Sequence, residues 1–367
     1  MEVKYLDLPQ QFDDPELIRA VADLFKTCQF IMGPEVARFE EKFAELCGTR
    51  FALGVNSGTD ALFLALKVLG VGPGHEVITV SNSFIATAGA IVAAGARPVF
   101  VDVAQDYNIN PTLIEAALTS RTKAILPVHL TGNPANLPKI LDIARKHGLV
   151  VVEDAAQAIG AAINGQPVGS FGHLGCFSLH PLKNLNVAGD GGMMTTNEEE
   201  VYLQLKKMRN HGLKNRDEID FFAYNSRLDT LQALVAAHRL KRLDQITAQR
   251  RKNAGLYDEL LSSPEDEVII PPRRPNFTQV FHTYVIQVRD RGNLIRHLAA
   301  KRIETKVHYP IPIHLQAPCR QMGWKPGDLP ETEKQAAHIL SLPIHQHLTL
   351  EQVGYVAHTI RDFYGRR

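Results

Sequence analysis

The feature that most constrains the fold of this chain is a regular alternation of two patterns between about residues 50 and 200. Short runs rich in β-branched residues alternate with longer runs in which apolar residues recur at helical spacing. The expected strands are Phe51–Val55, Glu76–Val80, Pro98–Asp102, Lys123–Val128 and Leu149–Glu153, and the expected helices are Asp60–Leu69, Ala86–Ala94, Pro111–Leu118 and Leu137–His147. Such strand–helix–strand units predict an α/β fold with a mostly parallel central sheet sandwiched by helices.

The chain is long enough for two domains. It has 367 residues, and a single hydrophobic core rarely serves more than about 250–300 residues. A helical stretch from about Asp229 to Leu261 carries an apolar stripe, and the composition then shifts to Pro, Ser and charge over Ser262–Asn276. We therefore expect a large domain of residues 1–250 and a smaller C-terminal α+β domain of residues 251–367.

Charge and composition exclude several classes of partner. The 40 basic and 39 acidic residues leave a formal charge of +1, which gives no electrostatic reason to expect nucleic acid or an anionic membrane as a partner. No apolar run is long enough to span a bilayer, and the first 15 residues lack a signal-peptide pattern, so we expect a cytoplasmic location. The four cysteines are far apart and form no C-x-x-C pair, which favours buried free thiols over a disulfide or a metal site.

A turn of small residues, Asn56–Asp60, joins the first expected strand to a helix. Small residues at such a turn leave backbone N–H groups free to hold a phosphate, although the same residues also suit a plain helix cap. The chain has neither the Gly-Lys-Ser/Thr of a Walker A loop nor the G-x-G-x-x-G of a dinucleotide fold. A nicotinamide-dependent sugar oxidoreductase is therefore suggested only by the strand–helix alternation.

Two charged residues follow later strands. Asp154 comes after Leu149–Glu153, where a carboxylate lies at the ligand-binding edge of a parallel sheet or caps a following helix. Lys183 lies in a Pro-containing turn after a β-rich run, just before Gly189–Gly192. A surface lysine has the same pattern, but a turn of this kind can also present an amine to a cleft. A lysine that forms an imine must be uncharged, so its pKa must be lowered by burial or by a nearby cation.

In combination these features have the order and spacing of fold-type I enzymes that use pyridoxal phosphate (PLP). The chain resembles the DegT-type sugar aminotransferases, which act on nucleotide-linked keto-sugars, and the resemblance covers nearly its whole length. The matching segments are Gly33–Val36, Asn56–Asp60, Ser83–Thr87, Glu153–Gln157, Phe177–Leu185, Gly189–Gly192, Asn225–Asp229, His308–His314 and Ser341–Pro343.

The resemblance implies roles for individual residues around PLP. Lys183 would hold the cofactor as a Schiff base and then move a proton between substrate and cofactor. Asp154 would pair with the pyridine nitrogen and keep it protonated, and Gln157 would contact the 3-hydroxyl side. Phe84 would stack on the ring, unless it is an ordinary core aromatic. The phosphate-binding residues would be Gly58, Thr59 and Ser178, with Asn225 supplied by the neighbouring subunit of a homodimer with shared active sites.

On the substrate side the resemblance points to Arg227, His308 and Tyr309. An arginine suits a diphosphate or a carboxylate through its planar fork, while His308 and His314 could equally be structural. Two segments depart from the family: Thr131-Gly132-Asn133 stands where many relatives have Tyr-Gly-Gln, and Asn186 stands where many have Gly. These positions bear on the identity of the sugar and not on the cofactor chemistry.

The expected reaction is transamination, because a dehydratase branch of the family replaces the lysine by histidine. We expect glutamate to donate the amine to a nucleotide-linked keto-sugar, as in amino-sugar and polysaccharide biosynthesis. The segment from His308 to Pro312 is similar to that of members that aminate carbon 3 of the hexose. The alternatives are a carbon-4 keto-sugar aminotransferase, a cyclitol (inosose) aminotransferase and a PLP-binding regulatory protein. The sequence leaves open the sugar, the nucleotide, the donor and the choice of dimer or tetramer.

Overall fold

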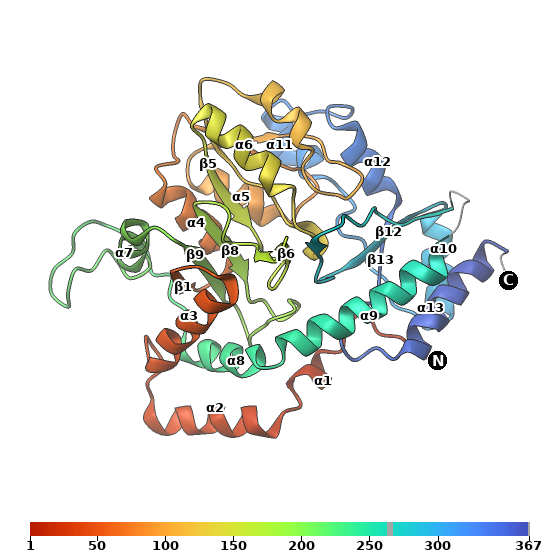
Figure 1. Ribbon diagram of the computed structural model, residues 1–367, viewed down its shortest axis with the longest axis horizontal. Helices are drawn as coiled ribbons and strands as arrows, with labels where there is room; N and C mark the ends of the chain where they lie inside the picture. Colours follow the sequence, from red (N-terminus) through yellow and green to blue (C-terminus); the bar gives the residue numbers. More distant parts are fainter. Residues whose placement is uncertain (263–266, 366–367) are drawn as a thin grey trace.

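The computed structural model describes residues 1–262 and 267–365, and its centre is a seven-stranded sheet (Figure 1). Its strands are β1 (Phe51–Val55), β2 (Glu76–Thr79), β3 (Arg97–Phe100), β4 (Thr122–Ile125), β5 (Val150–Asp154), β8 (Leu174–Ser178) and β9 (Gly192–Thr196). They lie in the order β1-β9-β8-β5-β4-β2-β3. Only β9 runs antiparallel to its neighbours, so the predicted mostly parallel sheet is confirmed.

Helices cover both faces of this sheet because its strands are apolar on both sides. Alternate residues of one strand enter different cores, as the two-residue repeat of a strand requires. Ala52, Phe177 and Met193 join the core that contains α3 (Pro34–Cys47) and α8 (Thr230–Leu240). Their neighbours Leu53, Cys176 and Met194 join the core that contains α4 (Gly58–Val68) and α5 (Ile85–Ala93).

Most of the expected elements are present, and two expected helices differ. β1 and α6 (Leu137–His147) have the predicted bounds. The predicted helix Pro111–Leu118 is wrong, since the segment forms two short 3-10 helices, Pro111–Leu113 and Glu115–Ala117. It buries only Ile114, so an α-helix there would gain little from packing. The long helical stretch is broken at Lys241 and Arg242, between α8 and α9 (Leu243–Leu261).

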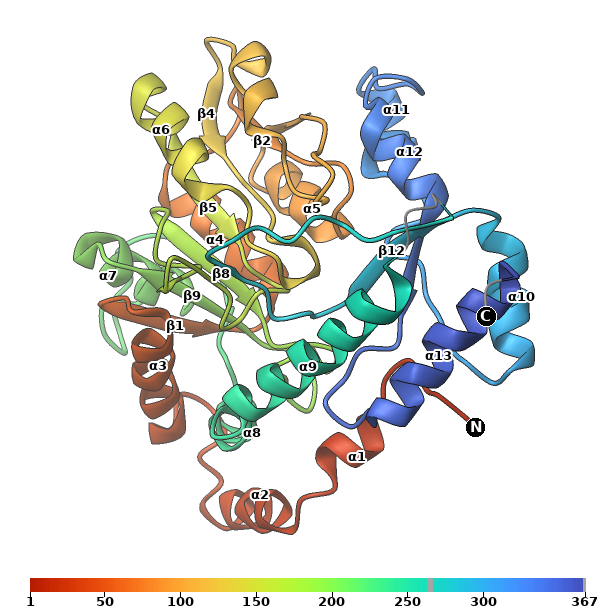
Figure 2. The same ribbon diagram turned by 45° about the vertical axis from the view of Figure 1, so that its right-hand side comes forward.

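The C-terminal part contains a second, antiparallel sheet and its own core (Figure 2). Its strands are β10 (Val268–Ile269), β12 (Tyr284–Val288) and β13 (Ile339–Leu342), and the far half of α9, α10 (Arg291–Ala300) and α13 (Leu350–Phe363) pack with them. The near half of α9 belongs to the core of α3 and α8 through Leu243. A domain boundary at residues 250 and 251, inside α9, stays a prediction. In the Ser262–Asn276 stretch, residues 263–266 lie outside the described part.

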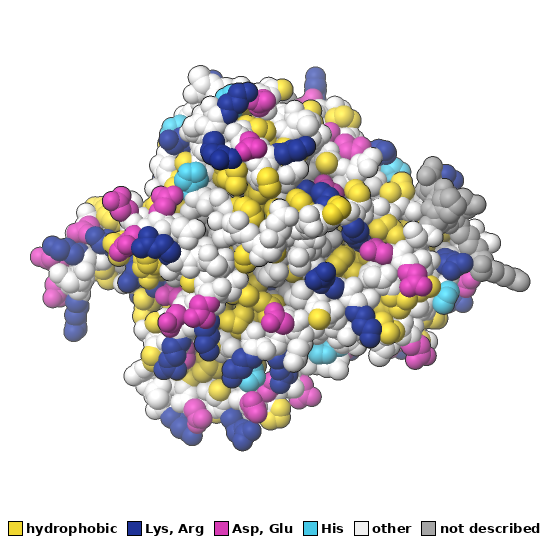
Figure 3. All heavy atoms as spheres, viewed as in Figure 1, with side chains coloured by type: hydrophobic (Ala, Val, Ile, Leu, Met, Phe, Trp, Pro, Cys, Tyr) yellow, Lys and Arg dark blue, Asp and Glu magenta, His cyan; other side chains and the backbone are white. Residues whose placement is uncertain are grey.

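The N-terminal helices α1 (Leu8–Phe12) and α2 (Pro15–Thr27) lie beside α8. The segment between α7 (Glu199–Met208) and α8 projects from the body of the molecule on the left of Figure 1, and Phe222 within it is 95% exposed. Positive and negative side chains are intermixed on the face shown in Figure 3. Among the described residues, no helix combines the length and apolarity that crossing a bilayer requires.

The cysteines are free thiols, as predicted, but one of them is not buried. Cys47, Cys176 and Cys319 are buried, whereas Cys28 is exposed. Cys28 caps the C-terminal end of α2 in the left-handed backbone conformation, and its thiol donates to the Phe25 carbonyl oxygen at 3.2 Å. The prediction of a buried thiol is therefore wrong at this position.

Candidate active site

A cavity of about 490 Å³ lies at the ends of β5 and β8, beside the start of α4. Because β5 and β8 are parallel neighbours, their carboxyl ends meet at one edge of the sheet. The predicted site residues that line the cavity are Gly58, Thr59, Phe84, Asp154, Gln157, Ser178, Lys183, His308 and Tyr309. The fold therefore brings together side chains that lie up to 251 positions apart, from residue 58 to residue 309.

Asp154 is the last residue of β5, and its carboxyl group is buried at the wall of this cavity. Its Oδ2 accepts a hydrogen bond from Thr87 Oγ1 at 2.7 Å, and its Oδ1 accepts one from the Ala156 N–H at 3.2 Å. Burial raises the pKa of Asp154, and the two hydrogen bonds and the charge of Lys183 oppose that rise. The residues after Asp154 form a turn and not a helix, so the helix-cap alternative does not apply.

Lys183 reaches the cavity from the turn that follows β8. Its own N–H donates to the carbonyl oxygen of His180 at 2.8 Å, which closes that turn. Burial lowers the pKa of Lys183 to about 8, although the charge of Asp154 acts in the opposite direction. At neutral pH a useful fraction of the amine is therefore uncharged and can act as a nucleophile.

The start of α4 lines the cavity next to the end of β8. Ser57 caps this helix, since its Oγ accepts a hydrogen bond from the Asp60 N–H at 3.1 Å. The first N–H groups of a helix have no acceptor within it, which makes this end suited to an anion. A Cβ on Gly58 would lie 2.7 Å from the Cβ of Ser178, so only glycine lets the turn and the end of β8 approach this closely.

Phe84, Gln157 and Tyr309 line the side of the cavity. Phe84 is 55% exposed, which rules out an ordinary core position, and its ring centroid lies 6.1 Å from that of Tyr309. Gln157 accepts a hydrogen bond from the Thr131 N–H at 2.8 Å, and its Nε2 lies 3.4 Å from the hydroxyl of Tyr309. One of the positions that departs from the family, Thr131, thus contacts a predicted cofactor residue.

The two histidines whose roles the sequence left open differ in their surroundings. His308 lines the cavity, and its Nδ1 lies 3.0 Å from Ser341 Oγ. Burial, and then the nearby charge of Lys183, lowers the pKa of His308 to about 4, so the ring is neutral at physiological pH. His314 is buried outside the cavity between Ser81 and Glu333, at 2.7 and 3.0 Å, which is a structural position.

Asn225 and Arg227 do not line the cavity in a single chain. Asn225 is exposed, and Arg227 donates a hydrogen bond to Asn210 Oδ1 at 3.1 Å. Both belong to the projecting segment between α7 and α8, in which Asn225 forms a backbone bridge with Asn210, two residues after the end of α7. Their predicted contacts with cofactor and substrate stay predictions.

Several cavity residues had no predicted role. Thr87 holds Asp154, and Ser83 Oγ lies 2.7 Å from the Thr87 hydroxyl. Their spacing of four residues, at the start of a helix that follows a strand, is a signal that sequence analysis can use. His282 also lines the cavity, but it comes from a loop of the C-terminal part and has no recognisable sequence signal.

These residues fit PLP. The cavity volume lies within the usual range of about 300–1,000 Å³ for small-molecule sites. It offers a helix start for the phosphate, an exposed aromatic face for the ring, and a buried carboxylate for the ring nitrogen. It also offers an amine of lowered pKa for the aldehyde.

Comparisons with known proteins agree with this fit. The model of the DegT/DnrJ/EryC1/StrS aminotransferase family matches residues 11–361. A solved structure described as "S. venezuelae DesV in complex with ketimine intermediate" has a TM-score of 0.97 and 39% identity, and the match covers 100% of this chain and 99% of that one.

Three curated relatives match over almost their whole length. A "pleiotropic regulatory protein" of Geobacillus stearothermophilus is 43% identical over 99% of both chains. A UDP-N-acetyl-3-dehydro-alpha-D-glucosamine 3-aminotransferase of Acidithiobacillus ferrooxidans is 43% identical over 94% of this chain and 93% of its own. A dTDP-3-amino-3,4,6-trideoxy-alpha-D-glucose transaminase of Streptomyces venezuelae is 39% identical over 98% and 96%, respectively. The chain therefore belongs to the DegT/DnrJ/EryC1/StrS aminotransferase family and is a PLP-dependent aminotransferase.

Proposed function

We propose that this enzyme transfers an amino group from glutamate to carbon 3 of a keto-hexose linked to a nucleotide. Two relatives that are similar over more than nine-tenths of the chain carry the proposal. One is named as a 3-aminotransferase of a 3-dehydro sugar, and the other is named for a 3-amino sugar. The segment from His308 to Pro312, which is similar to that of carbon-3 enzymes, supports the same position on the sugar. The presence of Lys183 in the cavity supports transamination over dehydration.

Within the proposed site, each residue has a role that follows from its surroundings. PLP, when bound, supplies an electrophilic aldehyde and an electron-withdrawing ring. Lys183 would attach to it through Nζ and, once released, would accept and return the proton of the carbon that carries the amine. Asp154, which accepts hydrogen bonds from Thr87 and the Ala156 N–H, would keep a proton on the ring nitrogen. Gln157 and Phe84 would fix the plane of the ring.

The phosphate and the substrate would lie at opposite sides of the cavity. Gly58, Thr59 and Ser178 would bind the cofactor phosphate, and Asn225 of the neighbouring subunit in a homodimer would complete that site. His308 and Tyr309 would contact the sugar as neutral hydrogen-bonding groups, since burial lowers the pKa of His308 to about 4 and raises the pKa of Tyr309. Arg227 would pair with the diphosphate.

A direct assay tests the proposal. The purified enzyme is incubated with PLP, glutamate and UDP- or dTDP-linked sugars that carry a keto group at carbon 3 or carbon 4. We expect an amino sugar only from a 3-keto substrate, with the Lys183→Ala variant as the inactive control. Product from 4-keto sugars alone would overturn the carbon-3 assignment, and glutamine as the sole effective donor would overturn the choice of glutamate.

A second candidate, a PLP-binding regulatory protein, is favoured by the name of the Geobacillus relative. A working aminotransferase converts its bound cofactor when a donor is added, and a pure binding protein does not. We expect glutamate alone to shift the absorbance band of the bound cofactor. An unchanged spectrum with every amino acid offered would favour the regulatory protein.

A further inference from the structure

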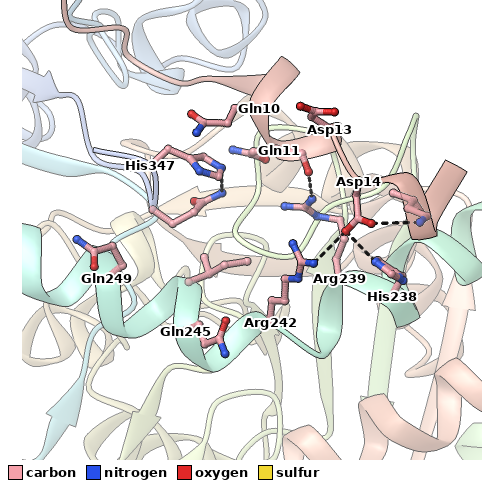
Figure 4. A pocket seen from close by; sticks show the side chains of 13 residues that line it. Gln10, Gln11, Asp13, Asp14, His238, Arg239, Arg242, Gln245, Gln249 and His347 are labelled. Atoms are coloured by element: carbon pink, nitrogen blue, oxygen red, sulfur yellow. Dashed lines mark hydrogen bonds and ion pairs between the residues drawn. The ribbon is translucent and has the colours of Figure 1, made fainter. Parts of the chain in front are cut away.

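A second cavity, of about 330 Å³, lies between the N-terminal helices and the junction of α8 and α9 (Figure 4). It shares no lining residue with the active-site cavity. Its wall is formed by polar side chains of α1, the start of α2, α8, α9 and the segment after β13.

Arg239 of α8 is the buried cation of this cavity, with only 8% of its surface exposed. One Nη1–H donates to the carbonyl oxygen of Gln11, and the guanidinium carbon lies 5.2 Å from the centre of the Phe12 ring. Its Nε has no hydrogen-bond partner. In the described part of the chain, no carboxylate forms an ion pair with Arg239.

The buried carboxylate that lines the same cavity, Asp14, already has partners on both of its oxygens. Its Oδ2 lies 3.0 Å from His238 Nε2 and 3.2 Å from Arg242 Nη2, as the dashed lines in Figure 4 show. Its Oδ1 accepts hydrogen bonds from two backbone N–H groups at the start of α2. Asp14 therefore balances Arg242 and leaves the charge of Arg239 without a partner of its own.

Arg239 remains charged despite its burial. Its pKa is lowered to about 10, first by burial and then by the charge of Arg242, while Asp14 acts in the opposite direction. A buried cation without a counter-ion is unfavourable, and an anion placed beside it removes that cost. The amides of Gln245 and Gln249 face the same cavity and can donate further hydrogen bonds, whereas Asp13 lies at the solvent-exposed rim.

From these contacts we propose that the cavity at Arg239 binds a small oxyanion, the carboxylate or phosphate group of a small molecule. The guanidinium provides the positive charge, and the glutamine amides provide neutral donors around it. The site is independent of the reaction at Lys183 and of the sugar that the enzyme uses.

Calorimetric titration of the PLP-loaded enzyme tests this proposal. The bound cofactor occupies its own phosphate site, and the variants described below distinguish binding at Arg239 from binding at the nucleotide-sugar side of the active site. Inorganic phosphate and acetate are titrated separately, and we expect one binding event per chain for at least one of them. Binding of phosphate alone assigns a phosphorylated ligand, and binding of acetate assigns a carboxylate.

Two variants and a matched control locate the site. We expect Arg239→Gln and Gln245→Glu each to weaken binding at least about tenfold, since one removes the cation and the other adds a repelling charge. Ala248→Glu adds the same charge on the exposed part of the same helix, outside the cavity lining, and is expected to leave binding unchanged. Gln245 is exposed, so its variant remains informative if the Arg239 variant does not fold.

Three results would overturn the proposal. The first is the absence of binding with both probes. The second is an equal loss of affinity in the Gln245→Glu and Ala248→Glu variants, which would indicate unspecific repulsion. The third is a crystal structure of the holoenzyme in which a side chain of another subunit fills the cavity and pairs with Arg239.

Discussion

At the scale of single residues, burial acts in opposite directions on the two groups that face the cofactor cavity. It raises the pKa of the Asp154 carboxyl group and lowers the pKa of the Lys183 amine to about 8, because it disfavours the charged form of each. Each charge also stabilises the other, which limits both shifts. The amine of Lys183 is therefore partly neutral near pH 8, and the charge of Lys183 favours the ionised form of Asp154.

The first prediction concerns the pH dependence of cofactor attachment. Only the neutral amine of Lys183 reacts, so the rate constant for PLP attachment to the apoenzyme should rise about tenfold per pH unit below pH 8 and level off above it. Stopped-flow absorbance at several pH values measures this rate. A midpoint near the ordinary lysine pKa of about 10.4 would contradict the burial of the amine.

The second prediction concerns Thr87, whose hydroxyl donates to Asp154 Oδ2. Thr87→Val removes a hydrogen bond to a charged group, worth about 1.5–3 kcal/mol, and so raises the pKa of Asp154 further. We expect PLP affinity to fall about tenfold or more. Protonation of Asp154 weakens PLP binding on acidification, and in the variant this weakening should set in at a higher pH than in the wild type.

Titration of the apoenzyme with PLP across pH measures this change. Thr87→Ser keeps the hydroxyl and should restore most of the affinity. If the valine variant binds PLP like the wild type, or if serine fails to rescue it, Thr87 does not support Asp154 in this way.

At the scale of elements, local patterns in the sequence indicated the parts of the site that lie next to one strand end, whereas His308 and Tyr309 were expected only from the family resemblance. The turn before α4, the strand that ends at Asp154 and the turn that carries Lys183 each have a short sequence pattern. His282 has none, because a loop from the C-terminal part brings it to the cavity. The segment from Pro111 to Leu118 has helical spacing but too little buried apolar surface to form an α-helix.

The third prediction concerns the link between α1 and the Lys183 turn. Asn186 is fully buried, and its Nδ2 donates to Gln11 Oε1 at 2.8 Å and to the carbonyl oxygen of Pro181. Asn186→Ala removes both bonds and leaves the Gln11 acceptor unpaired, so we expect a loss of about 1–3 kcal/mol in the free energy of unfolding.

Thermal unfolding of the apoenzyme and PLP titration measure the effect. We expect a lower Tm and a several-fold weaker affinity for PLP, because the turn that presents Lys183 loses its anchor. Asn293→Ala, at an exposed position on α10, is the control and should change neither quantity. Equal behaviour of the two variants would mean that α1 does not position the turn.

At the scale of the whole molecule, two of the residues proposed for the site lie outside the cavity of a single chain. Asn225 and Arg227 belong to the segment between α7 and α8, which projects from the body and exposes Ile219 and Phe222. An exposed apolar group of this kind is typical of a surface that another chain covers. The family resemblance names these residues and assigns Asn225 to the neighbouring subunit, whereas no local pattern in the sequence could indicate that, since it depends on assembly.

The fourth prediction tests this shared site with mixed dimers. Lys183→Ala and Asn225→Asp subunits are unfolded, mixed in equal amounts and refolded together. If each site combines Lys183 of one subunit with Asn225 of the other, about one quarter of the sites should recover wild-type affinity for PLP. If both residues act within one chain, no wild-type site can form and the mixture should bind like its separate components.

The most direct test of the central claim, that Lys183 is the lysine that holds PLP beside Asp154, is chemical. Borohydride reduction of the holoenzyme makes the link between lysine and cofactor permanent, and mass spectrometry of the digested protein then locates it. We predict the phosphopyridoxyl group on the peptide that contains Lys183 and on no other lysine peptide. A cofactor adduct on a different lysine, with the Lys183 peptide unmodified, would contradict the assignment.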